Sequence, residues 1–94
     1  MERTTKRDEN LKKKLLNRLN RLEGQVRGLK TMVKEDIYCD DILTQIAATK
    51  GALNGISRLV LENHLKNCIV RDIKNDKENT IDELLSTIER MTKL

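Results

Sequence analysis

The histidine at position 64 is the only one in the chain, and it lies four residues before Cys68, one of two cysteines. In a helix, positions four apart share a face about one turn from each other, so this imidazole and thiolate could bind one metal ion. Two ligands leave a site incomplete, and Cys39 is the other cysteine. Two thiolates and an imidazole favour soft ions, Cu(I) above all. Zn(II) is possible if Asp40 adds a fourth ligand.

Each of these residues also has a structural explanation. A buried cysteine commonly packs as a small apolar side chain. A histidine near the end of a helix can complement the helix dipole. The spacing alone therefore leaves both explanations open.

The composition is typical of a small helical protein that assembles. The chain has 94 residues, 36% of them charged, no Pro, Trp or Phe and one Tyr. Aliphatic stripes must then form the core, and one copy has so thin a core that burial against a second copy is favoured. The net charge of +4 multiplies on assembly, which suits a surface for nucleic acid or anionic lipid.

Several functional classes are disfavoured. No segment has the length and apolarity of a membrane span, and the first residues lack the apolar core of a signal peptide, so we expect a cytoplasmic protein with reduced thiols. The sequence shows no nucleophile with a positioned base, no pair of catalytic carboxylates and no phosphate loop. We therefore expect neither an enzyme nor a small organic substrate.

Apolar spacing predicts a single all-α domain of three helices over residues 1–94, with 1–9 flexible. The first helix runs from about Leu11 to Lys34. The second begins within the acidic segment 35–41, with Cys39 at or just before its N-terminus, and continues to about Ile69. A capping box at 80–83 precedes a short third helix, whose inward residues are expected to be Ile81, Leu84, Leu85, Ile88 and Met91.

All four glycines lie inside the predicted helices, in two pairs four apart: Gly24 with Gly28, and Gly51 with Gly55. Each costs up to about 1 kcal/mol relative to Ala in a helix interior. We expect them to permit close helix packing or to provide local flexibility.

Helix length decides how Cys39 could join the other two ligands. His64 follows it by 25 residues, which separates them by roughly 35 to 40 Å along one helix. A single chain cannot close that gap. An antiparallel second copy would place Cys39 of one protomer beside His64 and Cys68 of the other, giving a two-fold dimer two equivalent sites.

Three segments resemble the copper-sensing operon repressors, within the CsoR/RcnR/FrmR family of bacterial regulators. They are RLNRLEGQVRG (18–28), DIYCDDILTQIAATKGAL (36–53) and LENHLKNCI (61–69). Together they cover nearly the whole chain, and the separations from Cys39 to His64 and Cys68 are similar to the Cys-His-Cys pattern of the family.

The resemblance implies an all-helical antiparallel homodimer, usually paired into a tetramer. It implies a repressor that binds operator DNA when metal-free and releases it, with copper-resistance genes derepressed, when one Cu(I) per protomer binds Cys39 of one chain and His64 and Cys68 of the other.

Residue identities favour copper within this family. Nickel and cobalt members use an extra N-terminal histidine and a histidine in the last position, where this chain has Arg7 and Cys68. Formaldehyde-responsive members lack the last cysteine, and persulfide-responsive members lack the histidine. The alternatives are a thiol-, persulfide- or other-metal-responsive repressor on the same scaffold, and a copper carrier that binds no DNA.

The resemblance also places Tyr38 and Glu83 near the metal network, although Glu83 is explained equally by the capping box. No helix-turn-helix or zinc-finger spacing is visible, so we expect DNA to bind a basic surface of the first two helices. A run of charged residues usually forms only a solvated face, and this simpler explanation applies most to the three lysines at positions 12–14. The candidate DNA-binding residues are Arg18, Arg21, Lys13, Lys14 and Lys50.

Overall fold

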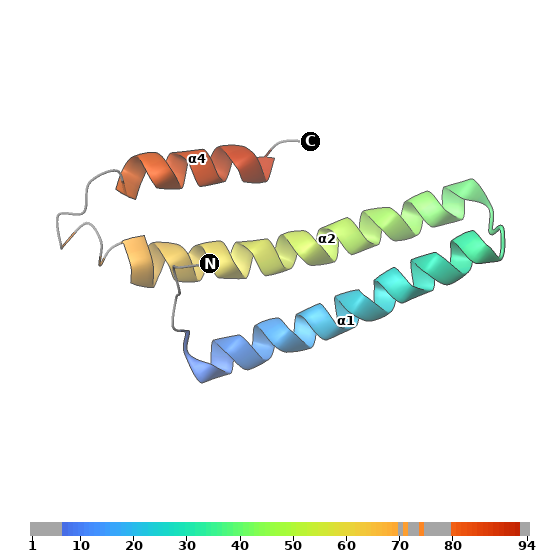
Figure 1. Ribbon diagram of the computed structural model, residues 1–94, viewed down its shortest axis with the longest axis horizontal. Coiled ribbons are helices and arrows are strands. Elements are labelled where there is room, and N and C mark those ends of the chain that lie inside the picture. Colours follow the sequence, from blue (N-terminus) through green and yellow to red (C-terminus); the bar gives the residue numbers. More distant parts are fainter. Residues whose placement is uncertain (1–6, 70, 72–73, 75–79, 93–94) are drawn as a thin grey trace. The chain divides into compact units, whose positions relative to one another are not determined.

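A computed structural model describes residues 7–69, 71, 74 and 80–92 of the chain. The elements are α1 (Glu9–Lys34), α2 (Cys39–Asn63), the π-helical turn η1 (His64–Ile69) and α4 (Thr80–Thr92). Every element in these residues is helical (Figure 1), which confirms the predicted all-α class. The chain divides into two compact units, Met1–Val60 and Leu61–Leu94.

In the first unit, α1 and α2 form an antiparallel hairpin (Figure 1). α1 begins at Glu9, before the first apolar position at Leu11, because Asp8 caps it. The Asp8 side chain accepts a hydrogen bond from the Asn10 backbone N–H at 3.4 Å, and its carbonyl accepts one from the Lys12 N–H at 2.9 Å. Residues 1–9 are expected from the sequence to be flexible. Residues 1–6 of this segment lie outside the described residues, and Glu9 already belongs to α1.

The turn between α1 and α2 is a Schellman motif made without glycine. The N–H of Ile37 donates to the carbonyl of Met32 at 3.0 Å, and that of Asp36 donates to Val33 at 3.3 Å. These two bonds satisfy the last carbonyls of α1. Asp36 has φ 54°, the left-handed region that normally selects glycine.

Asp36→Gly is expected to raise the free energy of unfolding by about 1 kcal/mol, because glycine adopts this backbone conformation without steric cost. Asp36→Val should lower it by a similar amount or more. Chemical denaturation at one fixed protein concentration measures both changes. Glu35→Gly is the matched control: Glu35 has φ −93°, so glycine there should not stabilise the protein, and equal gains at both positions would contradict this explanation.

The core between α1 and α2 is thin. Of the described apolar residues, only Leu15 on α1 and Ile56 on α2 are buried, at 8% and 7% exposure. Leu11, Leu22 and Leu29 are half-buried on the same stripe of α1 as Leu15. The single chain therefore buries little apolar area, as its composition predicts.

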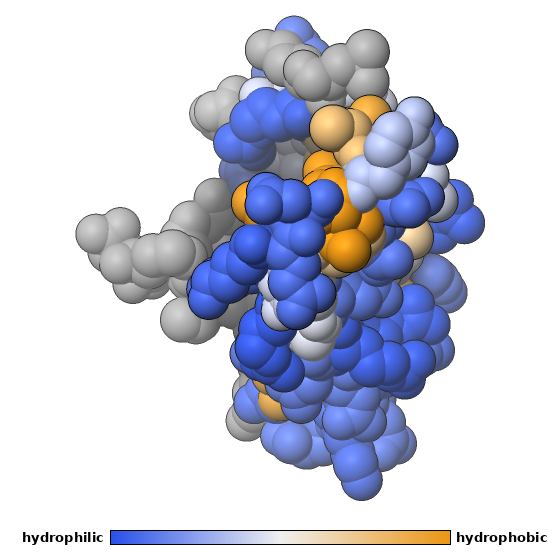
Figure 2. Space-filling view, turned by 90° about the vertical axis from the view of Figure 1, so that its right-hand side faces the viewer, coloured by the Kyte–Doolittle hydropathy of each residue, from blue (hydrophilic) through white to orange (hydrophobic). Residues whose placement is uncertain are grey.

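Many large apolar side chains remain exposed. Figure 2 looks onto the end where α1 turns into α2, and it shows apolar side chains open to the surface among hydrophilic ones. The exposed apolar residues of the first unit occupy a second stripe on each helix: Leu16, Leu19, Val26 and Val33 on α1, and Leu43, Ile46 and Leu53 on α2. A single chain thus leaves one apolar face of each helix uncovered.

Within the chain, the glycines do not bring two backbones together. A Cβ at Gly28 or Gly51 would meet nothing within 4 Å, and one at Gly24 would meet only Arg27 of its own helix, at 3.9 Å. At Gly55 the neighbour is a side chain, because Nη1 of Arg18 lies 3.4 Å from the Cβ position. Close backbone packing inside the protomer is therefore not the role of these glycines.

In the second unit, α4 begins at Thr80, which is buried. Thr80 and Glu83 each have an interaction partner, and the capping box between them remains a prediction. The sequence predicts five inward apolar residues on this helix, and in the single chain the prediction is wrong for four of them. Leu84 is half-buried, but the other four are exposed: Ile81, Leu85, Ile88 and Met91.

Candidate functional site

Cys39 is the first residue of α2, and its thiol is free and exposed. The backbone carbonyl of Tyr38 accepts hydrogen bonds from the N–H groups of Asp41 and Ile42 at 3.0 and 3.2 Å, which fixes the first turn of the helix. Tyr38 itself is 73% exposed. The cysteine is therefore presented on a well-defined helix start and is open to a ligand from outside the chain.

His64 and Cys68 belong to the π-helical turn η1 that directly follows α2. The sequence predicts a helix here but gives no sign that its last turn is π-helical. A π-turn inserts an extra residue into the helical ladder and occurs frequently at functional sites. The predicted metal-binding pair thus lies in the one element of the described chain whose backbone departs from α-helix or its caps.

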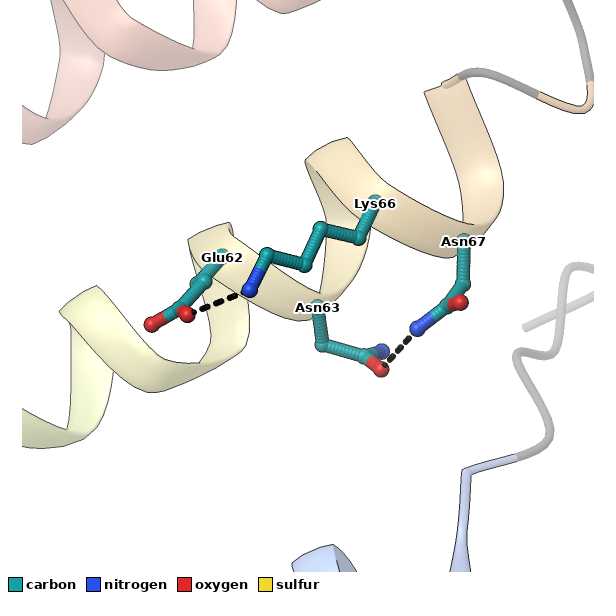
Figure 3. Close-up of polar contacts among 4 residues, drawn as sticks. All are labelled: Glu62, Asn63, Lys66 and Asn67. Atoms are coloured by element: carbon teal, nitrogen blue, oxygen red, sulfur yellow. Dashed lines mark hydrogen bonds and ion pairs between the residues drawn. The ribbon is translucent and has the colours of Figure 1, made fainter.

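Two pairs of side chains just before and within this turn show how closely positions four apart approach (Figure 3). Nζ of Lys66 lies 2.9 Å from Oε1 of Glu62. Nδ2 of Asn67 donates to Oδ1 of Asn63 at 2.8 Å. His64 and Cys68 have the same spacing in the sequence, and their approach to a common metal ion stays a prediction.

α2 is continuous from Cys39 to Asn63, so a helix of roughly 36 Å separates the first cysteine from the His64–Cys68 pair. That one chain cannot assemble all three ligands stays a prediction. In the part of the chain that the structure describes, no three His, Cys, Asp or Glu residues are grouped to hold a metal ion.

The helical periodicity adds an observation that the sequence analysis missed. Separations of 25 and 29 residues from Cys39 to His64 and Cys68 are close to seven and eight whole turns of 3.6 residues. A continuous α-helix would therefore predict all three positions on one side, but His64 and Cys68 lie in η1, after α2 ends at Asn63. Within α2, the exposed residues Leu43, Ile46 and Leu53 lie on the same side as Cys39. We call this side of α2 the ligand stripe.

The candidate DNA-binding residues do not all share one surface. Arg18 and Arg21 line a cavity of about 260 Å³ with Leu22 and Gln25 of α1 and Ala52 of α2. Lys14 precedes Arg18 by four residues and lies on the same side of α1.

Lys13 and Lys50 are exposed but point elsewhere. Lys13 lies next to Lys14 and is therefore turned by about 100° from it, and Lys50 lies two residues from Ala52, about 200° around α2. The structure thus joins Arg18 and Arg21 but not Lys13 and Lys50, and the DNA-binding role of all five residues remains a prediction.

Gln25 was missed by the sequence analysis. Its Oε1 atom is buried and has no hydrogen-bond partner, which typically costs about 1 to 3 kcal/mol. The signal was present in the spacing, because Arg18 and Gln25 interrupt the inward stripe of α1 between Leu15, Leu22 and Leu29. Polar residues at such core positions often mark a site.

No described helix has the length and apolarity needed to cross a membrane. The structure is a small helical protein with three candidate soft-metal ligands and an arginine-lined cavity. This combination is typical of metal-responsive DNA-binding proteins.

Comparison with known proteins identifies the family. Residues 11–90 match the model of the family described as metal-sensitive transcriptional repressors. Over 83 residues the chain is 45% identical to the copper-sensing transcriptional repressor CsoR of Bacillus subtilis, covering 87% of this chain and 82% of that protein. It is 48% identical over 56 residues to the copper-sensing repressor RicR of Mycobacterium tuberculosis, covering 60% and 58%.

Solved structures agree. The copper-sensing repressor CsoR with Cu(I) from Geobacillus thermodenitrificans matches with a TM-score of 0.88 and 35% identity, covering 96% of this chain and 95% of that one. The nickel-responsive regulator InrS matches with a TM-score of 0.71 and 39% identity, covering 93% and 96%. The chain belongs to the metal-sensitive transcriptional repressor family, whose members are DNA-binding regulators rather than enzymes.

Proposed function

We propose that this protein is a cytoplasmic Cu(I)-responsive repressor, which binds operator DNA when metal-free and releases it when Cu(I) binds, so that copper-resistance genes are derepressed. The observation that carries this proposal is that Cys39 is the first residue of α2, while His64 and Cys68 belong to η1, which directly follows the other end of α2. An antiparallel copy that packs on the ligand stripe brings the two ends together. The apolar residues Leu43, Ile46 and Leu53 on this stripe are suited to that contact.

The donor set, rather than the fold, points to copper. Both a copper-sensing and a nickel-responsive regulator resemble this chain in structure, so the scaffold is compatible with either metal. Two thiolates and one imidazole suit Cu(I), which accepts few, soft ligands, whereas Ni(II) prefers nitrogen- and oxygen-rich tetragonal sites. We assign one Cu(I) per protomer, with Zn(II) as a weaker substitute in vitro, in a homodimer that pairs into a tetramer.

Release of DNA is a linkage effect. If Cu(I) binds the DNA-free conformation more tightly than the DNA-bound one, metal and operator weaken each other by the same factor. α2 can carry this coupling because it begins at the ligand position Cys39, leads directly into η1 with His64 and Cys68, and forms one wall of the arginine-lined cavity through Ala52. A small bend or shift of α2 on metal binding would change the width of that cavity.

The test is a DNA-binding titration with the promoter region upstream of this protein's own gene, under anaerobic reducing conditions. We expect binding at low salt, and one equivalent of Cu(I) per protomer should weaken it by about 10- to 100-fold. A protein that binds no DNA would be a copper carrier instead. Binding that ignores Cu(I) but is lost with Ni(II), Co(II) or a persulfide would reassign the inducer.

His64→Ala separates the copper sensor from a purely thiol-based sensor on the same scaffold. A copper sensor should lose most of its response, because the imidazole is one of three ligands. A sensor that works by a reaction between Cys39 and Cys68 does not need the imidazole and should respond as before. The same DNA titration, repeated with Cu(I) and with a persulfide, measures both responses.

A further inference from the structure

The cavity between α1 and α2 has polar side chains on the wall formed by α1 and very small residues on the wall formed by α2. α1 contributes the side chains of Arg18, Arg21 and Gln25, and α2 contributes Ala52. Gly55, about one turn further along α2, lies beside the guanidinium of Arg18. Because Ala52 and Gly55 have little or no side chain, they leave the cavity open.

The charges in this cavity are not neutralised. Neither Arg18 nor Arg21 forms an ion pair or hydrogen bond with any residue that the structure describes. By contrast, Arg27 on the opposite side of α1 lies 3.7 Å from Glu23. No carboxylate is among the lining residues. Two guanidinium groups without a carboxylate partner favour an anion that can accept several hydrogen bonds, and phosphate oxygens fit this pattern.

Gln25 is the second, independent sign of a missing ligand. Its buried Oε1 has no partner in the structure. Rotation of the terminal amide by half a turn exchanges this oxygen for the NH₂ group, which can donate to an oxyanion. The cavity of about 260 Å³ has room for a phosphate group with water, since one water molecule needs only about 10 to 15 Å³.

We propose that this cavity is a phosphate-binding pocket that holds one backbone phosphate of the operator DNA, with Arg18 and Arg21 supplying charge and Gln25 an uncharged donor. The proposal rests on the DNA-binding function proposed above and adds the chemical group that these residues recognise. A backbone phosphate carries no base information, so the pocket sets the position of the protein on the duplex rather than the sequence it reads.

Gln25→Leu is the sharpest test, because it removes the amide without removing charge or much volume. We expect its DNA affinity to fall about tenfold. The slope of log affinity against log salt should stay that of the wild type, because no charged contact is lost. The melting temperature of the free protein should stay the same or rise, because a buried polar atom without a partner is gone. A residue with a merely structural role would lower stability and leave DNA affinity unchanged.

Arg21→Gln should both weaken binding and reduce the salt slope by about 0.9, the value for one phosphate contact on duplex DNA. Arg27→Gln is its matched control, since Arg27 is already paired with Glu23. It should retain the wild-type slope. Equal slopes for Arg21→Gln and Arg27→Gln would overturn the assignment of Arg21 to the pocket.

Two substitutions at Gly55 test the shape of the pocket. Gly55→Ala places a methyl group 3.4 Å from Nη1 of Arg18, an ordinary contact, so DNA affinity should be retained. Gly55→Val extends further and must displace the guanidinium, which should lower affinity about tenfold. Both variants remove a helix glycine, so neither is expected to unfold the protein. Equal affinities for the two would contradict the proposed position of Arg18.

The outcomes separate this proposal from the general function. Failure of the wild-type protein to bind DNA at low salt would refute the repressor function itself. Wild-type binding with unchanged affinity in Gln25→Leu would refute the pocket alone. The last measurement adds inorganic phosphate at constant ionic strength. Phosphate could raise the melting temperature of the wild type but not of Gln25→Leu, while the two proteins bind DNA with the same affinity. In that case the pocket binds a free oxyanion, and the assignment to DNA is wrong.

Discussion

Mixing two variants that each fail to bind Cu(I) is expected to restore about one quarter of the wild-type sites, because each site draws its ligands from two chains related by a two-fold axis. The two variants are Cys39→Ser and Cys68→Ser. In a heterodimer, the intact Cys39 of one chain meets the intact His64 and Cys68 of the other and completes one site. The second site of that heterodimer lacks both thiolates.

The expected fraction follows from random exchange: half of the dimers are heterodimers, and each has one complete site of two. Each variant alone should lose Cu(I) affinity by on the order of a hundredfold or more, since loss of a direct ligand exceeds the loss of an outer hydrogen-bond partner. Competition with a chromophoric Cu(I) chelator, after the two variants are unfolded and refolded together, measures the restored sites.

The control mixes His64→Ala with Cys68→Ser. Both substitutions affect the same half of the site, so no pairing of these chains completes it, and no sites should be restored. Restoration in neither mixture would show that the ligands do not come from two chains. Restoration in both would show that His64 and Cys68 do not act together in one half-site.

The helices were predictable because their cause is local. Apolar residues such as Leu15, Leu22 and Leu29 recur with the helical period, and that signal needs no knowledge of the rest of the fold. The argument that Cys39 and His64 belong to different chains rests on a rise of 1.5 Å per residue, and it stays a prediction. Sequence reasoning succeeded for the helices because a periodic pattern determines them.

Other features depend on backbone detail that residue types do not encode. The left-handed conformation of Asp36 gives no sequence signal, because glycine is the residue normally expected there. The π-turn at His64–Ile69 involves ordinary helix-forming residues. The cavity beside Gln25 requires the actual register of α1 against α2, which sets Ala52 and Gly55 opposite Arg18.

The exposed apolar faces explain a different discrepancy. Ile81, Leu85, Ile88 and Met91 of α4 are apolar by sequence and exposed in the single chain. An apolar face on an amphipathic helix predicts that this face is buried, but it does not identify the surface that covers it. The same reasoning applies to the ligand stripe of α2, where we propose that a second copy provides the cover.

Leu53→Lys is expected to dissociate the dimer and abolish Cu(I) binding together. If Cys39 of one chain meets His64 and Cys68 of the other, the two-fold axis must cross α2 midway between these ends, near Ala52 and Leu53. Leu53 is 49% exposed in the single chain, yet it would then pack against its own symmetry mate. Two lysines at the axis would replace an apolar contact with like charges.

Burial of one leucine contributes about 1.5 to 3 kcal/mol, and the axis doubles the loss, so the dissociation constant should rise by on the order of a thousandfold. Sedimentation velocity measures the association state, and the chelator competition measures Cu(I) binding in the same samples. Ala48→Lys is the matched control, because Ala48 is exposed on the side of α2 opposite Cys39 and should leave both unchanged. A Leu53→Lys protein that still dimerises and binds Cu(I) would show that α2 does not pair through the ligand stripe. If it dimerises but loses Cu(I), the axis lies elsewhere on α2 and the shared site requires a different register.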